Sequence, residues 1–237
     1  MLDGVQASVA RGSVHALIGP NGSGKTTLLN CISGILRPDR GEVRLRGHRI
    51  DTLRPNRRAR LGVGRTFQNI RLFGDMTVLD NVLLGRHCRT RAGLLRAWTR
   101  LPFRPLREEV SARRRAKELL TVVGLADRAL DPAASLPLAD QRRVEIARAL
   151  ATDPELVLLD EPAAGMTPRE KLEINALIRE IVAGGCTILL VEHDVALVMD
   201  LSDVVTVLNF GRKIAEGPPA DVRDNPLVVE AYLGRED

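Results

Sequence analysis

The fold is decided by residues 14–26, which read VHALIGPNGSGKT. Val14–Gly19 is a short apolar run that ends in glycine, and this pattern predicts a buried strand. The next stretch, Gly19–Thr26, matches the spacing G-x-x-x-x-G-K-S/T without a mismatch. Lys25–Ser33 then predicts a helix. A chance glycine-rich turn would lack this order of strand, loop and helix, so the stretch predicts an α/β fold with a phosphate-binding loop.

The residue types of this loop are those that phosphate binding requires. Glycines let backbone N–H groups approach phosphate oxygens closely, and the following helix directs its positive end toward them. The Lys25 ammonium neutralises the β and γ phosphates, and the Thr26 hydroxyl holds magnesium. The loop therefore predicts binding of ATP with Mg2+, and the candidate nucleotide-binding residues are Gly19, Pro20, Asn21, Gly22, Ser23, Gly24, Lys25, Thr26 and Thr27.

Composition agrees with a folded, intracellular chain. Of the 237 residues, 44% are hydrophobic and 27% are charged. This balance predicts a sizeable core rather than disorder, and the length allows one large domain or two small ones. The three cysteines (Cys31, Cys88 and Cys186) lack the spacing of metal or disulfide sites. We therefore expect reduced thiols in a reducing compartment.

Targeting and nucleic-acid patterns are missing from the sequence. Residues 1–11 lack a basic cluster followed by an apolar run, so we expect no signal peptide. No stretch approaches the roughly 20 apolar residues of a membrane span, which predicts a cytosolic or peripheral protein. The net charge is +5, yet the chain has only four Phe, one Trp and one Tyr on which bases could stack. We therefore expect no nucleic-acid partner.

Apolar runs and helical periodicity alternate at both ends of the chain, while residues 76–151 are mainly helical. Such a pattern predicts a parallel core sheet with a helical insertion. The expected strands are Val14–Gly19, Gly62–Thr66, Leu156–Leu159, Thr187–Val191 and Val204–Asn209, with a small hairpin formed by Gly41–Leu45 and Arg49–Ile50. The expected helices are Lys25–Ser33, Met76–Arg86, Glu108–Val123, Asp140–Ala151, Pro168–Val182 and Pro226–Leu233, and Arg86–Arg107 is expected as an arginine-rich surface excursion.

Two carboxylates follow the apolar strand Leu156–Leu159. Asp160 is expected to approach the magnesium through water. Glu161 lies one step further, points in another direction and is expected to polarise an attacking water. Two acids at a strand end would by themselves indicate only the start of a loop. Combined with the phosphate-binding loop, they predict nucleotide hydrolysis.

Two further polar residues follow predicted strands. Gln68 comes after Gly62–Thr66, and its amide offers both a donor and an acceptor to the metal and its water. His193 comes after Thr187–Val191, from where an imidazole could reach the γ-phosphate. Either residue alone would be read as an ordinary polar or structural side chain. The order in which the motifs occur gives them their meaning.

That order, from the phosphate-binding loop through Gln68, Leu136–Leu150 and Leu158–Pro162 to His193, resembles the ATP-binding cassette (ABC) family over nearly the whole chain. The resemblance implies one ABC ATPase domain over residues 1–237, with a parallel core sheet and a small antiparallel β part. Its RecA-like core would comprise residues 1–75 and 152–237, and its helical subdomain residues 76–151. The implied roles are Q-loop glutamine for Gln68, catalytic base for Glu161 and switch histidine for His193, with magnesium held by Thr26, Gln68 and Asp160.

Finer features are similar to the ATPase subunits of branched-chain amino acid importers. They are RTFQNIRLF at 65–73, QRRVEIARAL at 141–150, EPAAGM at 161–166 and GRKIAEG at 211–217. This similarity implies two membrane permease subunits, a second ABC ATPase and an extracytoplasmic substrate-binding protein, with the chain peripheral on the cytoplasmic face of the inner membrane. The alternatives are a urea or amide importer, a degenerate nucleotide-binding subunit, and a non-transport ABC protein. A single cassette with few aromatic residues argues against the last.

The sequence departs from the family pattern in two places. The family's signature loop, close to Leu-Ser-Gly-Gly-Gln, presses on the γ-phosphate held by the partner subunit, and here it reads Leu136-Pro137-Leu138-Ala139-Asp140-Gln141. Ala139 adds a methyl group where backbone approaches phosphate, and Pro137 removes a hydroxyl and a backbone donor, so we expect an impaired half-site. The chain also starts near the family's second strand, so either the true start lies upstream, or the first strand and the adenine-stacking aromatic are missing.

Overall fold

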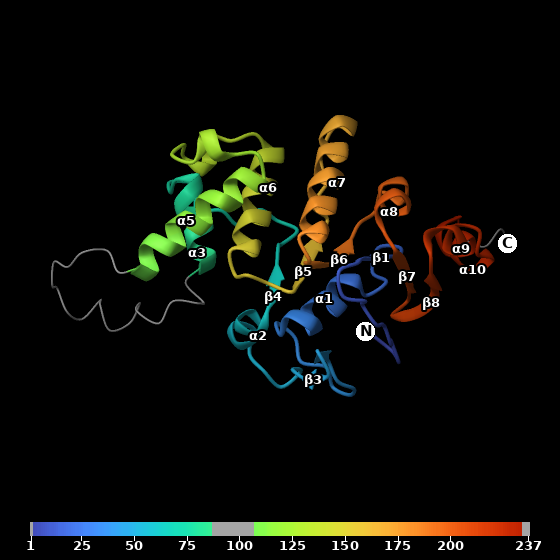
Figure 1. The fold of residues 1–237 in the computed structure, drawn as a ribbon. Coiled ribbons are helices and arrows are strands. Elements are labelled where there is room, and N and C mark those ends of the chain that lie inside the picture. Colours follow the sequence, from blue (N-terminus) through green and yellow to red (C-terminus); the bar gives the residue numbers. More distant parts are fainter. Residues whose placement is uncertain (1, 87–106, 234–237) are drawn as a thin grey trace.

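In the computed structural model, which describes residues 2–86 and 107–233, six strands form the main sheet in the order β4-β5-β6-β1-β7-β8 (Figure 1). All neighbouring strands are parallel except β7 and β8, which are antiparallel. A second, two-stranded antiparallel sheet pairs β2 with β3. The strand bounds are β1 Val14–Ile18, β2 Arg44–Leu45, β3 His48–Arg49, β4 Val63–Arg65, β5 Leu156–Asp160, β6 Thr187–Val191, β7 Val204–Asn209 and β8 Arg212–Gly217.

Helices surround this sheet, with α3, α5 and α6 gathered at one end of the molecule and α9 and α10 beside β8 at the other (Figure 1). Two single turns of 3-10 helix, Ala126–Arg128 and Ala133–Ser135, lead from α5 to α6. The helix bounds are α1 Lys25–Ser33, α2 Pro55–Leu61, α3 Val78–Arg86, α5 Arg107–Val122, α6 Leu138–Leu150, α7 Pro168–Ala183, α8 Val195–Leu201, α9 Pro219–Arg223 and α10 Pro226–Leu233.

Local chemistry explains where several elements begin and end. All five residues of β1 are buried, as expected for a strand flanked by parallel neighbours with helices on the faces. At the start of α3, Thr77 Oγ1 accepts from the Asp80 N–H at 3.0 Å. At the start of α7, Thr167 and Glu170 form a reciprocal capping box, and Pro168 occupies the first turn.

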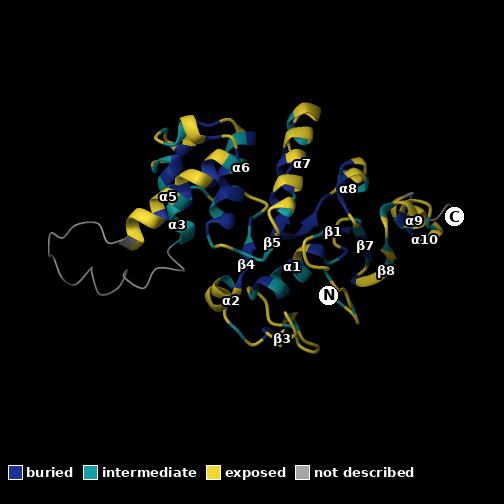
Figure 2. Cartoon of the chain, viewed as in Figure 1, coloured by how far each residue is buried: buried dark blue, intermediate teal, exposed yellow. Residues whose placement is uncertain are grey.

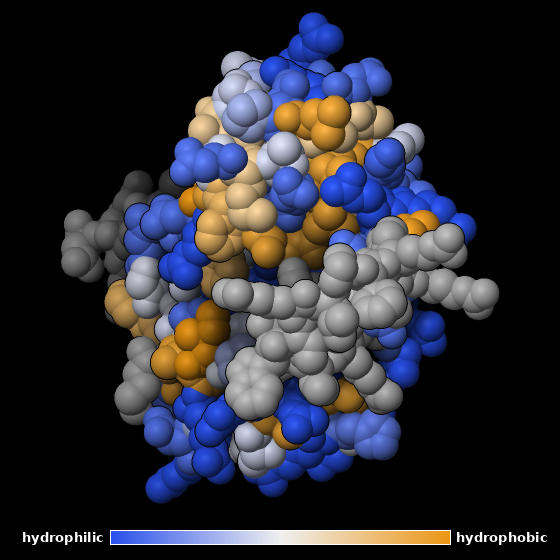
Figure 3. Space-filling view, turned by 90° about the vertical axis from the view of Figure 1, so that its left-hand side faces the viewer, coloured by the Kyte–Doolittle hydropathy of each residue, from blue (hydrophilic) through white to orange (hydrophobic). Residues whose placement is uncertain are grey.

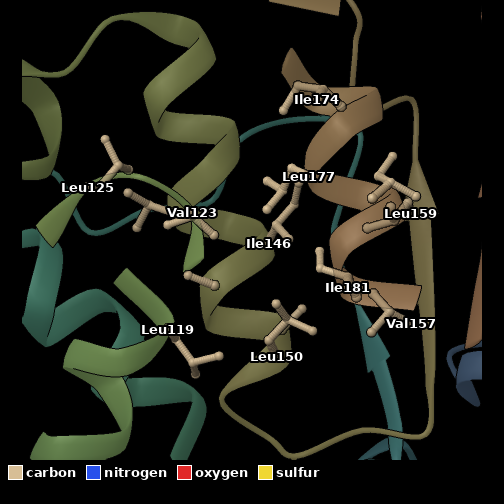
Figure 4. Packing of buried hydrophobic residues seen from close by; sticks show 14 of the residues in the cluster. Leu119, Val123, Leu125, Ile146, Leu150, Val157, Leu159, Ile174, Leu177 and Ile181 are labelled. Atoms are coloured by element: carbon tan, nitrogen blue, oxygen red, sulfur yellow. The ribbon is translucent and has the colours of Figure 1, made fainter. Parts of the chain in front are cut away.

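One large hydrophobic cluster connects the helical end of the molecule to the sheet. In Figure 4 the side chains of Ile146 from α6, Ile181 from α7 and Val157 from β5 lie together, and each is at most 6% exposed. Figure 2 shows the central strands β1, β5 and β7 largely buried, β3 and β8 without buried residues, and the outer faces of the helices exposed. Because α6 and β5 share this core, the residues at their ends are held in a fixed relation by packing.

Every expected strand and helix is found, although several boundaries move by one to three residues. Helix α6 begins at Leu138 rather than at Asp140, because Pro137 has extended backbone and caps the helix. Helices α2, α8 and α9 and strand β8 were not expected; β8 has no buried residue, so it lacks the apolar run that marks the other strands. Residues 2–13 contain no strand.

The helical insertion is only partly described. The expected excursion at Arg86–Arg107 lies outside the described residues except at its two ends. Helices α3, α5 and α6 fall within residues 76–151 and pack against one another. The boundaries of the helical subdomain remain a prediction.

Candidate active site

The phosphate-binding loop joins β1 to α1 through glycines that no other residue could replace easily. Gly19 has φ 148°, and a Cβ added there would lie 2.1 Å from the Leu208 carbonyl oxygen. Gly24 caps α1 with φ 105°, a left-handed conformation. The first turn of α1 therefore starts directly at Lys25 and presents its free N–H groups to the loop.

Lys25 lies folded over its own loop. Its Nζ donates to Gly19 O at 2.7 Å and to Pro20 O at 2.9 Å, and the residue is 6% exposed. Burial lowers the pKa of Lys25, while the nearby carboxylates of Glu161 and Asp160 oppose that shift. An ammonium held by two carbonyls can exchange those bonds for phosphate oxygens with little movement. Among the remaining loop residues, Ser23 is buried and Asn21, Gly22 and Thr26 are exposed.

Asp160 ends β5 and is 2% exposed. Its Oδ2 accepts from Arg65 Nη2 at 3.2 Å, and Arg65 also donates to Asn30 Oδ1 at 2.7 Å and to Ser33 Oγ at 2.8 Å. Burial raises the pKa of the Asp160 carboxyl, and the Arg65 guanidinium opposes this. Asp160 Oδ1 is buried without a hydrogen-bond partner. A buried acceptor of this kind requires an explanation, and a donor from a bound ligand would supply it.

The donor set around Asp160 fits a magnesium ion that arrives with phosphates. Magnesium prefers oxygen ligands and keeps several waters, and in nucleotide sites it is bound through one or two carboxylates together with the phosphates. The unpartnered Asp160 Oδ1 is suited to accept a hydrogen bond from such a water. Across residues 2–86 and 107–233, no group of three His, Cys, Asp or Glu could hold a metal ion without a ligand's help.

Glu161, Gln68 and His193 are brought together, as the order of motifs predicts. Glu161 Oε1 lies 2.5 Å from His193 Nε2, and Glu161 Oε2 accepts from Gln68 Nε2 at 3.1 Å. The three residues follow the ends of β5, β4 and β6 respectively. Glu161 has φ 51°, and its N–H donates to Val191 O at 2.9 Å. This left-handed backbone, which costs about 1–3 kcal/mol, turns the Glu161 side chain away from Asp160.

Glu192 is a residue of this site that sequence reasoning missed. It is 3% exposed, its Oε1 accepts from the Ala163 N–H at 2.9 Å, and its Oε2 accepts from the His193 N–H at 3.2 Å. Burial raises the pKa of Glu192. The carboxylate thus ties the loop after Glu161 to the backbone of His193. The sequence signal that could have identified Glu192 is the position of an acidic residue directly between an apolar strand and His193.

Arg65 is the second residue that was missed. Its side chain joins α1, through Asn30 and Ser33, to Asp160 at the end of β5. A charged residue in the strand Gly62–Thr66 gave no indication of its partner, because the sequence does not say which strand lies beside it.

The signature segment (Leu136–Gln141) leads into α6, which begins at Leu138. Ala139 is 7% exposed and belongs to the largest hydrophobic cluster, so its methyl group packs into the chain's own core. This burial does not favour a methyl group placed against a partner's phosphate, and the impaired half-site stays a prediction. The exposed residues of the segment are Pro137 and Leu138, and Leu138 lies beside Gly165. Asp140 pairs with Arg128 at 3.5 Å.

Family models match both ends of the chain. Residues 2–164 match the family described as ABC transporter. Residues 212–237 match the family described as Branched-chain amino acid ATP-binding cassette transporter.

Several curated proteins are similar over most of their length. The High-affinity branched-chain amino acid transport ATP-binding protein LivG of Salmonella typhimurium is 43% identical, covering 98% of this chain and 91% of that protein. LivG of Escherichia coli K12 is 45% identical, covering 93% and 87%. BraF of Pseudomonas aeruginosa, which has the same descriptive name, is 43% identical, covering 98% and 91%.

Solved structures share the fold. An ATP-binding cassette of an ABC transporter in its ADP conformation has a TM-score of 0.85 and 35% identity, covering 99% of this chain and 92% of the other. A nucleotide-free ATP-binding cassette has a TM-score of 0.86 and 34% identity, covering 99% and 93%.

Proposed function

The chain belongs to the ABC transporter family of ATPases, and we propose that it powers an importer of branched-chain or other hydrophobic amino acids. The observation that carries this proposal is the identity of 43–45% to LivG and BraF over 93–98% of the chain. The match of residues 212–237 to the branched-chain amino acid cassette model supports it independently, because that model covers a part of the chain outside the general ABC match.

We propose that ATP binds with its phosphates in the loop Gly19–Thr27. Lys25 would exchange its bonds to the loop carbonyls for bonds to the β and γ phosphates, and the N–H groups of α1 would donate to phosphate oxygens. Magnesium would be held by the Thr26 hydroxyl, the Gln68 amide and, through water, the Asp160 carboxylate. When bound, magnesium neutralises charge that develops on the phosphates.

We propose that Glu161 is the base that orients and polarises the attacking water. Both oxygens of its carboxylate have hydrogen-bond partners within the chain, His193 at Oε1 and Gln68 at Oε2. Bound ATP would draw Gln68 toward the metal and His193 toward the γ-phosphate, which frees the carboxylate to accept a proton from water. Occupied oxygens would thus restrain hydrolysis until nucleotide and water are both in place.

Transport requires partners, and we propose two membrane permease subunits, a second ABC ATPase and an extracytoplasmic substrate-binding protein. In the described ranges, none of the helices has the length and apolar character to cross a membrane, so the chain would be peripheral, on the cytoplasmic face of the inner membrane.

Exposed apolar residues of the helical end include Phe73 and Leu130. Figure 3, which looks onto that side, has apolar surface in its upper half, and permeases would contact this side.

A reconstituted complex tests the proposal. The chain, its partner ATPase, the permeases and the binding protein would be assembled in proteoliposomes, and ATP hydrolysis would be measured with leucine, isoleucine, valine, urea, RNA or no addition. We expect stimulation by the branched-chain amino acids and its loss in Glu161→Gln. Stimulation by urea alone would favour the amide importer. Unchanged activity in Glu161→Gln would favour a degenerate subunit, and stimulation by RNA would favour a non-transport protein.

A further inference from the structure

An arginine of α6 holds the backbone on which Gln68 sits. We call residues Phe67–Arg71 the Q-loop segment. Arg142 donates from Nη1 to Phe67 O at 2.9 Å and from Nη2 to Gln68 O at 2.5 Å. A guanidinium presents its donors in a rigid, planar arrangement, so two carbonyls bound to it have little freedom relative to each other. The starting point of the Gln68 side chain is therefore set by α6.

Two more charged residues, on the next two turns of α6, hold the other end of the Q-loop segment. Glu145 Oε1 accepts from the Arg71 N–H at 2.9 Å, and Arg148 Nη1 donates to Arg71 O at 2.5 Å. Glu145 also accepts from Arg142 at 3.4 Å and from Arg148 at 3.3 Å. We call Arg142, Glu145 and Arg148 the α6 triad. It binds four backbone groups of one loop to one helix.

Two members of the triad are buried and the third, Arg148, is half-buried, which makes a purely stabilising role a poor explanation for the triad. Glu145 is 2% exposed and Arg142 is 8% exposed, and burial raises the pKa of Glu145 although both arginines oppose this. Buried ion pairs contribute little net stability compared with apolar residues of similar volume. Charged groups do, however, fix direction, because each donor must meet its acceptor. Orientation of the Q-loop segment is the property that apolar packing would not supply.

Helix α6 connects the α6 triad, and with it the Q-loop segment, to the signature segment. Arg142 directly follows Gln141, the last residue of the signature segment, and both lie in the same continuous helix. At the candidate active site, Gln68 Nε2 donates to Glu161 Oε2 at 3.1 Å. A continuous series of contacts therefore runs from the exposed start of α6 to the candidate base of the nucleotide site.

We propose that the α6 triad positions Gln68 and is the link through which Gln68 is coupled to the signature segment. The inference rests on the proposed function, since Gln68 must act at bound ATP. ATP that draws Gln68 away from Glu161 would move the Q-loop segment, and the triad would pass that movement to α6. By reciprocity, docking of a partner on the signature segment would shift Gln68.

Hydrogen exchange with and without ATP tests the coupling in the full chain. We expect magnesium and ATP to slow exchange at the phosphate-binding loop and at residues 136–141 in the wild type. In Glu145→Gln and Arg142→Lys the slowing at the phosphate-binding loop should remain, and that at residues 136–141 should disappear. Arg143→Gln is the matched control, because Arg143 lies on the same helix but pairs with Glu173 of α7, and it should behave as the wild type does.

Different outcomes of this experiment test the proposed function and the coupling through the α6 triad. No slowing at the phosphate-binding loop in the wild type would overturn the proposed function. Slowing there without any change at residues 136–141 in the wild type, or an unchanged response in both triad variants, would overturn the coupling alone. Loss of the response at residues 136–141 in Arg143→Gln as well would mean that any charge change in α6 disturbs it, which also contradicts the proposal.

A double-mutant cycle on ATP turnover in the assembled transporter tests positioning. Arg142→Lys should lower kcat about tenfold with KM for ATP nearly unchanged, and the same substitution in a Gln68→Ala background should have an effect of less than about twofold, because its target is gone. Equal effects in the two backgrounds would show that Arg142 does not act through Gln68. An equally large effect of Arg143→Gln would also contradict the proposal.

Discussion

At the residue scale, Glu161 shows how one side chain is prepared for chemistry by its neighbours. Its backbone is left-handed, with φ 51°, and both of its carboxylate oxygens are held, by His193 and by Gln68. A strained residue persists only where surrounding contacts determine it, and here the bond from its N–H to Val191 O is one such contact. The strain separates two adjacent carboxylates into different directions.

Substitution of this carboxylate tests its chemical role. Glu161→Gln keeps the shape and removes the base, so kcat should fall about 10²–10⁴-fold, the usual contribution of general acid–base catalysis. Equilibrium binding of ATP should change little, because the phosphates contact Lys25 and the loop instead. Single-turnover hydrolysis and equilibrium dialysis would measure the two quantities. The control is Glu118→Gln, which removes an exposed carboxylate on α5. A comparable fall in that variant would contradict the assignment.

The first glycine of the phosphate-binding loop gives a second prediction at this scale. Gly19→Ala introduces a Cβ 2.1 Å from Leu208 O at φ 148°, so the loop and β7 must separate. Overpacking of this kind costs typically about 1–3 kcal/mol, and ATP affinity should fall with it. Urea unfolding and ATP titration would show both effects. In Gly12→Ala, where φ is 69° and nothing lies within 4 Å, the strain is present without the clash, so ATP binding should survive.

At the element scale, helix α6 has two functions in one stretch of regular structure. Its first turn contains residues 138–141 of the signature segment, and its next turns hold the Q-loop segment. The buried side of the same helix, with Ile146 and Leu150, packs against α7 and β5 (Figure 4). A rigid body that contacts both the core and a loop of the site can transmit displacement between them.

Helix α7 begins at a capping box formed by Thr167 and Glu170, whose spacing can be seen in the sequence. Thr167→Ala removes the acceptor for the Glu170 N–H and the hydroxyl that donates to Glu170 Oε2, so the free energy of unfolding should fall by about 1 kcal/mol. Equilibrium urea denaturation would measure it. Thr121→Ala is the comparison, because this exposed threonine lies within α5, where alanine is a better helix former. That variant should be neutral or slightly stabilised, and a loss equal to that of Thr167→Ala would rule out the cap as the cause.

Element types could be predicted because the periodic patterns were long and clear. The runs TILLV and VVTVLN gave β6 and β7 with their full bounds, and Pro168 with the glycines after α7 gave that helix. Strand β8 could not be predicted, because its stability comes from antiparallel pairing with β7 rather than from buried side chains. The inward direction of Ala139 depends on where α6 starts, and that start moved by two residues.

At the scale of the whole molecule, the parallel sheet gathers residues that are far apart in sequence. The loop after β1, Gln68 after β4, Glu161 after β5 and His193 after β6 meet because carboxyl ends of parallel strands share one edge. This rule made the trio predictable from the sequence. Specific side-chain contacts between distant elements, such as Arg65 with Asp160 across the neighbouring strands β4 and β5 and the α6 triad with the Q-loop segment, depend on packing geometry that no periodicity encodes.

Stability of the whole chain should respond to pH through Asp160, and the sign follows from burial. The pKa of its carboxyl is raised in the folded protein, so the folded state binds the proton more tightly than the unfolded state. Below its ordinary pKa of 3.8 this carboxyl is protonated in both states and therefore does not lower the free energy of unfolding. As the pH rises from there through the raised folded pKa, the carboxyl lowers the free energy of unfolding by a growing amount. Asp160→Asn should thus match the wild type at acidic pH and be more stable at neutral pH, without nucleotide.

With magnesium and ATP the wild type should instead be more stable than Asp160→Asn at neutral pH. This reversal separates the electrostatic cost of burying the carboxylate from its part in binding the metal. Ligand at 100 times its dissociation constant stabilises a protein by about 2.7 kcal/mol, and Asp160→Asn should lose most of this gain because the metal would lose its anionic contact. Thermal unfolding at pH 4 and pH 7, with and without magnesium and ATP, would measure both trends. Asp200→Asn, an exposed pair with Arg179, is the matched control and should keep the ligand's effect. Equal stabilisation of the wild type and of Asp160→Asn by magnesium and ATP would show that Asp160 has no part in binding the metal.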